Sequence, residues 1–202
     1  MRQVDTKASD TALWSLVLNG EGEAFGQVFD RYRDRVFNYS QRLIRSSQDA
    51  EDATAMVFLE CWRCRNKVRV VNGSLLPWLL ATTNNVARNH LRSTWRYSRL
   101  LAKIPGDIPI ADPADSVAED IDRQRQSRQI RMAFQSLRRP DREILALGIL
   151  GGLSLADIAG VLNIPLGTVK SRLSRAKHRL ARLLESASIS PLQEQDVDGR
   201  LR

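Results

Sequence analysis

A group of hydrogen-bond donors near residue 170 is the strongest chemical signal in the sequence. Lys170, Ser171, Ser174 and Arg175 fall on one face when the segment is drawn as an α-helix. Arginine can bind guanine through two parallel hydrogen bonds, and serine hydroxyls fit several base edges. The neighbouring cations suit backbone phosphates, and these are Arg172, Lys177, Arg179 and Arg182. The pattern predicts a surface that contacts DNA.

The opposite face of the same segment is apolar. Its residues recur at spacings of four and three, and they are Val169, Leu173, Ala176, Leu180 and Leu184. A helix that reads the major groove needs this division, because one side docks on its own domain while the other faces the base pairs. The alternative is an ordinary basic helix on the surface of a bundle.

Local signals upstream of this helix predict a second, shorter one. Ser154 followed three residues later by Asp157 has the spacing of a capping box, so a helix should begin at Leu155. Asn163 can adopt the left-handed conformation that ends a helix, and Pro165 suits the first position of the next. Two helices joined by so short a turn form a helix-turn-helix.

Two cysteines and a histidine are the other candidates for chemistry. Cys61 and Cys64 share a helical stripe with Val57 and Val68, which favours core packing, with a redox pair or half of a zinc site as the alternatives. His178 has no second ligand at a matching spacing. The sequence also lacks a Gly-rich phosphate loop and paired histidines. We therefore expect no enzymatic activity, no metal and no cofactor.

Helices must position these residues. In almost no segment do apolar and polar residues alternate with the period of two that is typical of a β-strand. Residues 25–43 form one long amphipathic pattern, and a second helix is expected over 49–68. A loop at 71–73 precedes a third helix that opens near Pro77 and reaches about Tyr97. The expected fold is all-α, with two small helical domains.

A segment rich in proline and acidic residues separates the two halves. Residues 103–122 lose the helical periodicity, which is typical of an extended linker. Helical patterning returns over 125–137, and Pro140 opens a further helix that stops at Gly151. The polar tail after Ser186 is expected to be disordered.

Charge and hydropathy limit the classes of protein to which the chain can belong. The 202 residues are 43% hydrophobic and carry a formal net charge of +8. No run approaches the roughly 18 apolar residues of a membrane span, and the first ten residues do not resemble a signal peptide, so we expect a cytoplasmic protein without membrane insertion. Residues 98–127 carry −2 between basic flanks, which indicates a polyanion held at two places. The predicted divisions are 12–97, a linker over 98–127, 128–185, and a tail over 186–202.

These motifs resemble the extracytoplasmic-function sigma factors of bacterial RNA polymerase, a group within the sigma-70 family. The run Gly167–Ala176 is similar to the recognition helix of region 4 in that family. The front half resembles region 2 through three short matches, which are Ala50-Glu51-Asp52, Val57-Phe58-Leu59 with Trp62-Arg63, and Pro77-Trp78-Leu79 followed by Asn85, Asn89 and Arg92.

The resemblance implies a dissociable subunit that binds the RNA polymerase core, recognises the −35 and −10 promoter elements, and aids opening. Region 2 would bind the core through Glu51, Asp52, Phe58, Leu59, Trp62 and Arg63. It would bind the −10 element through Asn85, Arg88, Arg92 and Trp95, with Asn85 lining a pocket for a flipped base and the loop 67–76 choosing that base. Region 4 would bind the −35 element through Lys170, Ser171, Arg172, Ser174 and Arg175. The family also implies an anti-sigma factor as a partner.

The sequence departs from the family pattern at several positions. Ala55 and Met56 replace a glutamine–glutamate pair, Thr82 and Thr83 replace isoleucine–alanine, Asn89 replaces an aspartate and Asp157 a glutamate. These changes indicate a divergent member with its own promoter preference.

Two other classes of protein remain open. A stand-alone helix-turn-helix regulator would bind an operator as a dimer without polymerase. A redox sensor would respond to oxidants through Cys61 and Cys64.

Overall fold

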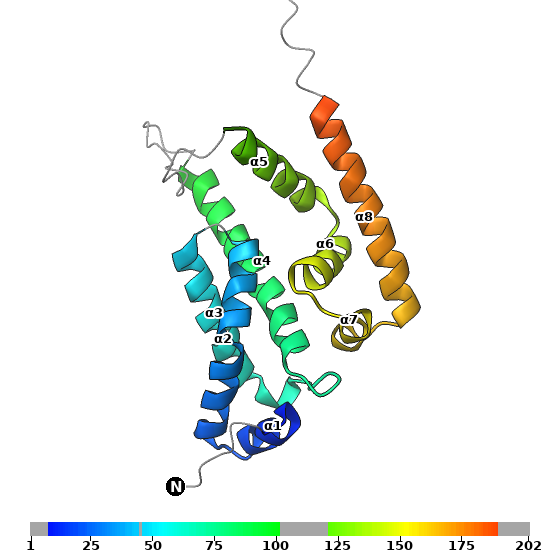
Figure 1. Ribbon diagram of the computed structural model, residues 1–202. Helices are drawn as coiled ribbons and strands as arrows, with labels where there is room; N and C mark the ends of the chain where they lie inside the picture. The colour runs from blue at the N-terminus through cyan, green and yellow to red at the C-terminus, as the bar shows by residue number, and fades with distance from the viewer. Residues whose placement is uncertain (1–7, 45, 102–120, 190–202) are drawn as a thin grey trace, which may run out of the picture.

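The chain is predominantly helical over the part that the structure describes, which comprises residues 8–44, 46–101 and 121–189 of a computed structural model (Figure 1). The front bundle contains α1 (Asp10–Leu18), α2 (Gly22–Leu43), α3 (Ser47–Arg63), the 3₁₀ turn η1 (Arg65–Lys67) and α4 (Leu76–Leu101). The rear bundle contains α5 (Ile121–Ser136), α6 (Arg139–Leu145), the π-helical turn η2 (Ala146–Leu150), α7 (Leu155–Leu162) and α8 (Leu166–Ile189). Over these residues there is no strand, which confirms the all-α prediction.

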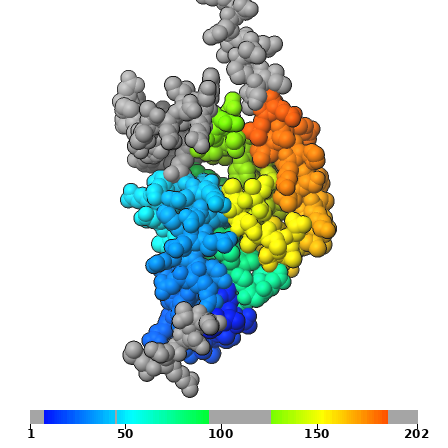
Figure 2. Space-filling model, viewed as in Figure 1, coloured from blue at the N-terminus to red at the C-terminus, as the bar shows by residue number. Residues whose placement is uncertain are grey.

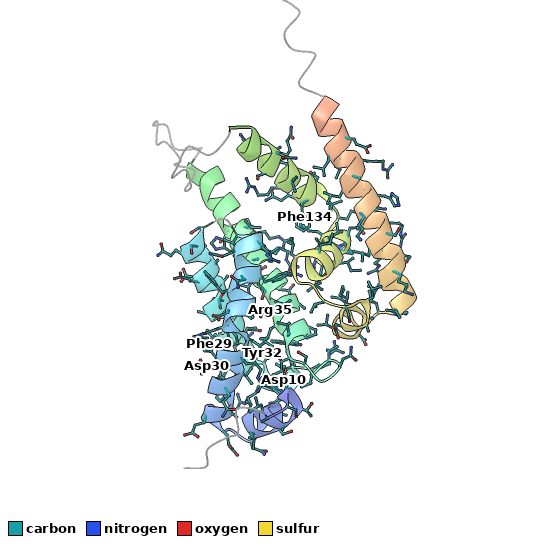
Figure 3. The ribbon with its side chains drawn as sticks, in the orientation of Figure 1. Asp10, Phe29, Asp30, Tyr32, Arg35 and Phe134 are labelled. Atoms are coloured by element: carbon teal, nitrogen blue, oxygen red, sulfur yellow. The ribbon has the colours of Figure 1, made fainter. Side chains whose placement is uncertain are left out.

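The front bundle is organised around one buried carboxylate. Asp10, at the start of α1, accepts hydrogen bonds from Arg31 at 2.6 Å, from the Tyr32 hydroxyl, and from the Leu75 backbone N–H at 2.7 Å. Figure 3 shows Asp10 and Tyr32 near the base of the bundle. A buried charge is tolerated only when it is paired and hydrogen-bonded, and here the pairing ties α1 to α2 and to the residue before α4.

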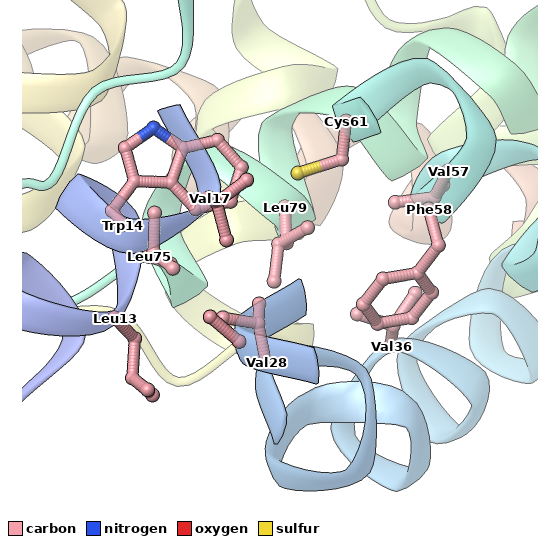
Figure 4. Close-up of a cluster of buried hydrophobic side chains, with 11 residues drawn as sticks. Leu13, Trp14, Val17, Val28, Val36, Val57, Phe58, Cys61, Leu75 and Leu79 are labelled. Atoms are coloured by element: carbon pink, nitrogen blue, oxygen red, sulfur yellow. The ribbon is translucent and has the colours of Figure 1, made fainter. Parts of the chain in front are cut away.

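Apolar side chains from all four front helices meet beside this carboxylate (Figure 4). Leu13 and Val17 come from α1, Val28 from α2, Val57 from α3 and Leu79 from α4, and all five are fully buried. Full burial of such a side chain contributes about 1.5–3 kcal/mol. The spacings of three and four in the sequence therefore do mark the faces that build the core.

The rear bundle packs α8 against α5 and α6, and Figure 1 shows α8 along its outer edge. Leu137, Leu145 and Ala176 form the buried centre of that contact. Asp141 is buried in the first turn of α6 and forms an ion pair with Arg179 of α8. The short helix α6 continues into η2, where the Gly151 N–H donates to the Ala146 carbonyl at 2.8 Å.

Three predicted boundaries differ from the structure. The second helix does not reach Val68, because Cys64 ends α3 and η1 follows. Helix α4 runs to Leu101 and α5 begins at Ile121, both inside the range assigned to the linker, whereas residues 102–120 lie outside the described part. The tail prediction began too early, since α8 continues to Ile189, and residues 190–202 are not described.

Candidate nucleic-acid interface

The helix-turn-helix of the rear bundle forms as its local sequence predicts. The Asp157 N–H donates to the Ser154 hydroxyl oxygen at 3.1 Å, and that hydroxyl lies 2.7 Å from the Asp157 carboxylate. Asn163 ends α7 in the left-handed region, with φ of 54°. The Pro165 carbonyl accepts the first hydrogen bonds of α8, so this helix begins at Leu166, one residue later than predicted.

Helix α8 divides into the two faces that the sequence predicts. Val169 and Ala176 are fully buried on its inner face. The predicted base-facing residues all lie on the exposed side, and these are Lys170, Ser171, Ser174 and Arg175. The Arg175 Nε donates to the Ser171 carbonyl at 3.2 Å, which holds the guanidinium along the outer face. The arrangement presents donors to solvent from a rigid, regular scaffold.

The flanking cations of α8 do not all face solvent. Lys177 and Arg182 are exposed and Arg172 is half-buried. Arg179, expected to contact a phosphate, instead forms the ion pair with buried Asp141. Its first role is thus to fasten α8 to α6, a contact between residues too far apart in sequence for a local pattern to reveal.

In the front bundle, α4 carries the predicted −10 residues on one stripe. Asn85 and Arg92 are exposed and Arg88 is half-buried, at spacings of three and four. The side chain of Trp95 lies outside the described residues. The Tyr39 hydroxyl of α2 donates to Asn84 Oδ1 of α4 at 2.8 Å, and this contact between helices helps to fix the rotation of α4. The buried Thr83 hydroxyl donates within α4, to the Leu79 carbonyl at 2.8 Å.

The loop before α4 is a tight hairpin. Val71 and Ser74 exchange backbone hydrogen bonds of 2.8 and 3.0 Å. Asn72 and Gly73 between them have φ of 49° and 79°, as a two-residue turn of type I′ requires. Asp10 also accepts from the Leu75 N–H, so the end of the loop next to α4 is anchored to α1. Asp10 carries no local signal in the sequence, because its partners Arg31, Tyr32 and Leu75 are all distant along the chain. The Asn-Gly pair was the local signal for the turn.

Helix α3 separates the predicted core-binding residues into two groups. Glu51, Asp52 and Arg63 are exposed, and Leu59 exposes 58% of its surface. Phe58 is buried instead, with its ring 4.8 Å from that of Phe29. Phe58 therefore supports α3 from within and is not on the surface that a partner would contact.

Trp62 lies at the edge of the same face of α3. It is half-buried, with its ring 5.1 Å from that of Phe25. The Arg65 guanidinium lies over the Trp62 ring, 5.0 Å from its centroid, within the range of a cation–π contact. Met56, at a position that departs from the family pattern, exposes 52% of its surface beside Leu59. The face thus combines acidic, apolar and basic side chains.

The two cysteines are poor candidates for redox chemistry. Cys61 is fully buried, and this burial raises the pKa of its thiol to about 12. The Cys64 thiol donates to Glu60 at 3.1 Å, and this hydrogen bond raises the Cys64 pKa as well. Reactive cysteines need a lowered pKa. Both thiols are free, and the packing of Cys61 agrees with its predicted place in the core.

The residues that the structure describes contain no group of three or more histidine, cysteine or acidic side chains able to hold a metal ion. Among those same residues, no helix is long and apolar enough to cross a bilayer.

Comparisons with known proteins agree with this architecture. Residues 28–97 match the family model of sigma-70 region 2, and residues 127–180 match that of sigma-70 region 4. The chain is 32% identical over 162 residues to the ECF RNA polymerase sigma factor SigK of Mycolicibacterium vanbaalenii, covering 80% of this chain and 82% of that protein.

Two solved structures share the fold. The structure of CnrH in complex with the cytosolic domain of CnrY has a TM-score of 0.58 at 20% identity, covering 90% of this chain and 99% of that one. The sigma factor RpoE in complex with the anti-sigma factor NepR from Bartonella quintana has a TM-score of 0.50 at 23% identity, covering 80% and 96%.

The chain belongs to the extracytoplasmic-function sigma factors of RNA polymerase. It binds the polymerase core and promoter DNA and directs promoter-specific initiation of transcription.

Proposed function

We propose that the two DNA-reading tasks of this sigma factor are divided between α8 and α4. The rear helix α8 holds the −35 element through Lys170, Ser171, Arg172, Ser174 and Arg175. The observation that supports this assignment is the separation of two faces on α8, with Val169 and Ala176 fully buried and Lys170, Ser171, Ser174 and Arg175 exposed. Arg175 makes the paired contact to guanine, and Arg172 positions the helix on a phosphate.

Helix α4 and the hairpin before it bind the −10 element. Asn85 offers an exposed amide, which can form hydrogen bonds to the edge of a flipped base. Arg88, Arg92 and Trp95 follow it along α4, where cations and an aromatic ring suit a single strand with stacked bases. The turn at Asn72 and Gly73 gives the hairpin a fixed shape, so its side chains can select one base.

The exposed face of α3 is the docking site for the polymerase core. Glu51, Asp52 and Arg63 supply charges around Leu59, an apolar side chain that is already exposed in the free chain. Trp62 lies beside them and suits the aromatic anchor of an interface. Burial of Leu59 and Met56 against the core would also remove an exposed apolar patch.

The remaining assignments follow from membership of the family. The protein acts without enzymatic activity of its own, in the cytoplasm, where its polymerase and promoters are. An anti-sigma factor restrains it, as in the complexes of CnrH with CnrY and of RpoE with NepR.

Footprinting with and without core polymerase tests this division of tasks. The purified chain alone should leave promoter DNA unprotected, whereas the complex with core polymerase should protect both elements. A tight, palindromic footprint from the chain alone would instead identify a dimeric operator-binding regulator.

A further inference from the structure

The hairpin before α4 joins an exposed turn to the core of the front bundle within a few residues. In Figure 2 the teal atoms around the hairpin lie at the surface, between the dark blue atoms of α1 and the yellow atoms of the rear bundle. Asn72 and Gly73 are exposed at the turn, whereas Leu75, two residues further on, is fully buried. The position of the turn therefore depends on how the segment next to α4 is held.

Polar contacts hold three consecutive residues of that segment. The Leu75 N–H donates to Asp10 Oδ2 at 2.7 Å. The Ser74 Oγ lies 3.2 Å from the Tyr32 hydroxyl oxygen and accepts from the Leu76 N–H, also at 3.2 Å. Any displacement of the segment must therefore break at least one of these hydrogen bonds.

The hydrogen bonds between the side chains of this network have a fixed direction. Burial raises the pKa of Tyr32 to about 12, so its hydroxyl keeps its proton at neutral pH. Tyr32 donates that single proton to Asp10, and its oxygen can therefore only accept from Ser74. The donors run from Ser74 through Tyr32 to the buried carboxylate. Because hydrogen bonds to an ionised acceptor are roughly twice as strong as neutral ones, Asp10 orders both hydroxyls.

Arg31 of α2 fixes the carboxylate itself. Its Nη1 donates to Asp10 Oδ1 at 2.6 Å, and its Nη2 donates to the Ala8 carbonyl at 2.9 Å. One oxygen of Asp10 thus accepts from Arg31, and the other accepts from the Tyr32 hydroxyl and the Leu75 N–H. The network connects α1, α2 and the hairpin through a single buried charge.

Apolar packing anchors the other arm of the hairpin. Val68 and Val70 pack against the front core, and Val71 is buried. The turn also contacts the rear bundle, where the Asn72 amide donates to the Asp157 carboxylate at 2.7 Å. No member of the network takes part in that contact, so the front bundle alone contains what positions the segment next to α4.

We propose, given the proposed −10 role of the hairpin, that Asp10, Tyr32 and Ser74 are positioning residues for the choice of the −10 base. Their network fixes the turn at Asn72 relative to Asn85 of α4. A site that discriminates between bases must hold its groups to within about 0.5 Å. Loss of one hydroxyl lets the turn shift, so that incorrect bases are accepted more readily.

The test removes one hydroxyl at a time and measures base selectivity. Tyr32→Phe and Ser74→Ala leave the carboxylate with Arg31 and the Leu75 N–H. Run-off transcription with core polymerase, on promoters that carry each of the four bases at each −10 position, gives the ratio of initiation between the best and the second-best base. Each variant should lower this ratio by about three- to tenfold, the range expected for the loss of one hydrogen bond.

Controls separate positioning from a general loss of structure. Ser15→Ala is the matched control, because the exposed Ser15 hydroxyl donates within α1, to the Thr11 carbonyl, and it should leave the ratio unchanged. Ser74→Thr retains the hydroxyl and should keep most of the ratio. The double variant Tyr32→Phe with Ser74→Ala should lose no more than either single variant, because both changes break the same chain of hydrogen bonds. Circular dichroism should show full helix content in every variant, and the dependence on −35 should be retained.

Asn72→Gly tests the −10 role of the hairpin separately. It removes an exposed side chain of the turn, and glycine accepts the left-handed backbone at this position. Altered selectivity in Asn72→Gly alone, with none in Ser74→Ala or Tyr32→Phe, would overturn the positioning role and leave the proposed function standing. Unchanged selectivity in all three would show that the hairpin selects no −10 base, and both proposals would fail. Equal losses of −35 and −10 dependence would also overturn the positioning role, since a merely structural defect produces them.

Discussion

The two bundles achieve their exposed functional faces in different ways. In the rear bundle the caps and the left-handed Asn163 lie within a few residues of the helices they shape. In the front bundle the decisive contacts are long-range, since Asp10 bonds to Arg31, Tyr32 and the Leu75 N–H. Under the proposed function this difference suits the two forms of DNA, because a regular helix fits a duplex groove and a hairpin of fixed shape presents a constant surface to an opened strand.

Removal of the buried carboxylate should affect only the front bundle, and strongly. Asp10→Ala leaves Arg31 without its partner and the Leu75 N–H without an acceptor, so we expect a loss of about 3–5 kcal/mol in the free energy of unfolding. Urea unfolding followed by far-UV circular dichroism measures this loss. Asp30→Ala, which removes an exposed carboxylate 3.8 Å from Arg33, is the control and should change stability by less than about 1 kcal/mol.

Loss of the paired guanine contact should affect only the rear bundle's reading of DNA. Arg175→Ala should weaken promoter binding by the polymerase complex by about 1–3 kcal/mol and relax the preference at one −35 base pair. Binding titrations over promoters with single −35 substitutions provide the measurement. Unchanged −35 selectivity would remove Arg175 from the base-reading set.

The corresponding change in the front bundle should act on opening rather than on binding. Asn85→Ala removes one amide from an exposed position of α4 and should slow promoter melting by roughly tenfold, the equivalent of about 1.4 kcal/mol. Permanganate reactivity of unpaired thymines reports melting, and a gel shift reports closed binding. A variant that melts promoters at the normal rate would show that Asn85 holds no base.

The helix cap of α7 should make a smaller, local contribution. Ser154→Ala removes the acceptor of the Asp157 N–H and should destabilise the rear bundle by about 1 kcal/mol. Ser136→Ala is the matched control, because its hydroxyl donates only along its own helix, to the Met132 carbonyl. Hydrogen exchange across α7 should rise in the first variant and stay unchanged in the second.

The front bundle should lose a small part of its stability at alkaline pH. Burial and the hydrogen bond to Asp10 raise the pKa of Tyr32 from 10.0 to about 12. The unfolded chain therefore loses this proton first, and the contribution of Tyr32 to stability is full below pH 10 and lost as the pH rises from 10 to about 12. Tyr32→Phe should flatten the decline in unfolding free energy over that window. An equal decline in both proteins would place the sensitivity elsewhere.

Sequence patterns predict those features of the fold that depend on residues close together in the chain. Ser154, Asp157 and Asn163 act within one or two helical turns, so the rear helix-turn-helix and the faces of α8 follow from sequence alone. Phe58 and Leu59 are adjacent and both apolar, but Phe58 packs against Phe25 and Phe29 of α2 while Leu59 is exposed. The pattern could not supply that information.

Periodic patterns in the sequence do not predict contacts between distant segments. Arg179 and Arg175 lie on the same helix and have similar neighbours in the sequence. Only Arg179 forms an ion pair with Asp141 of α6. In the sequence Gly160 is only a residue of low helix propensity in a short helix. In the structure Val71 lies so close to it that a side chain at position 160 would clash. The roles of Arg179 and Gly160 depend on contacts between segments that are distant in the sequence.

Run-off transcription with core polymerase tests the division of promoter reading most directly. The templates are one promoter and its derivatives with a scrambled −35 or −10 element, and the proteins are the unaltered chain, Arg175→Ala and Asn85→Ala. The account predicts that Arg175→Ala no longer distinguishes the −35 derivative while keeping its dependence on −10, and that Asn85→Ala shows the reverse. Equal loss of both dependences in both variants would contradict it.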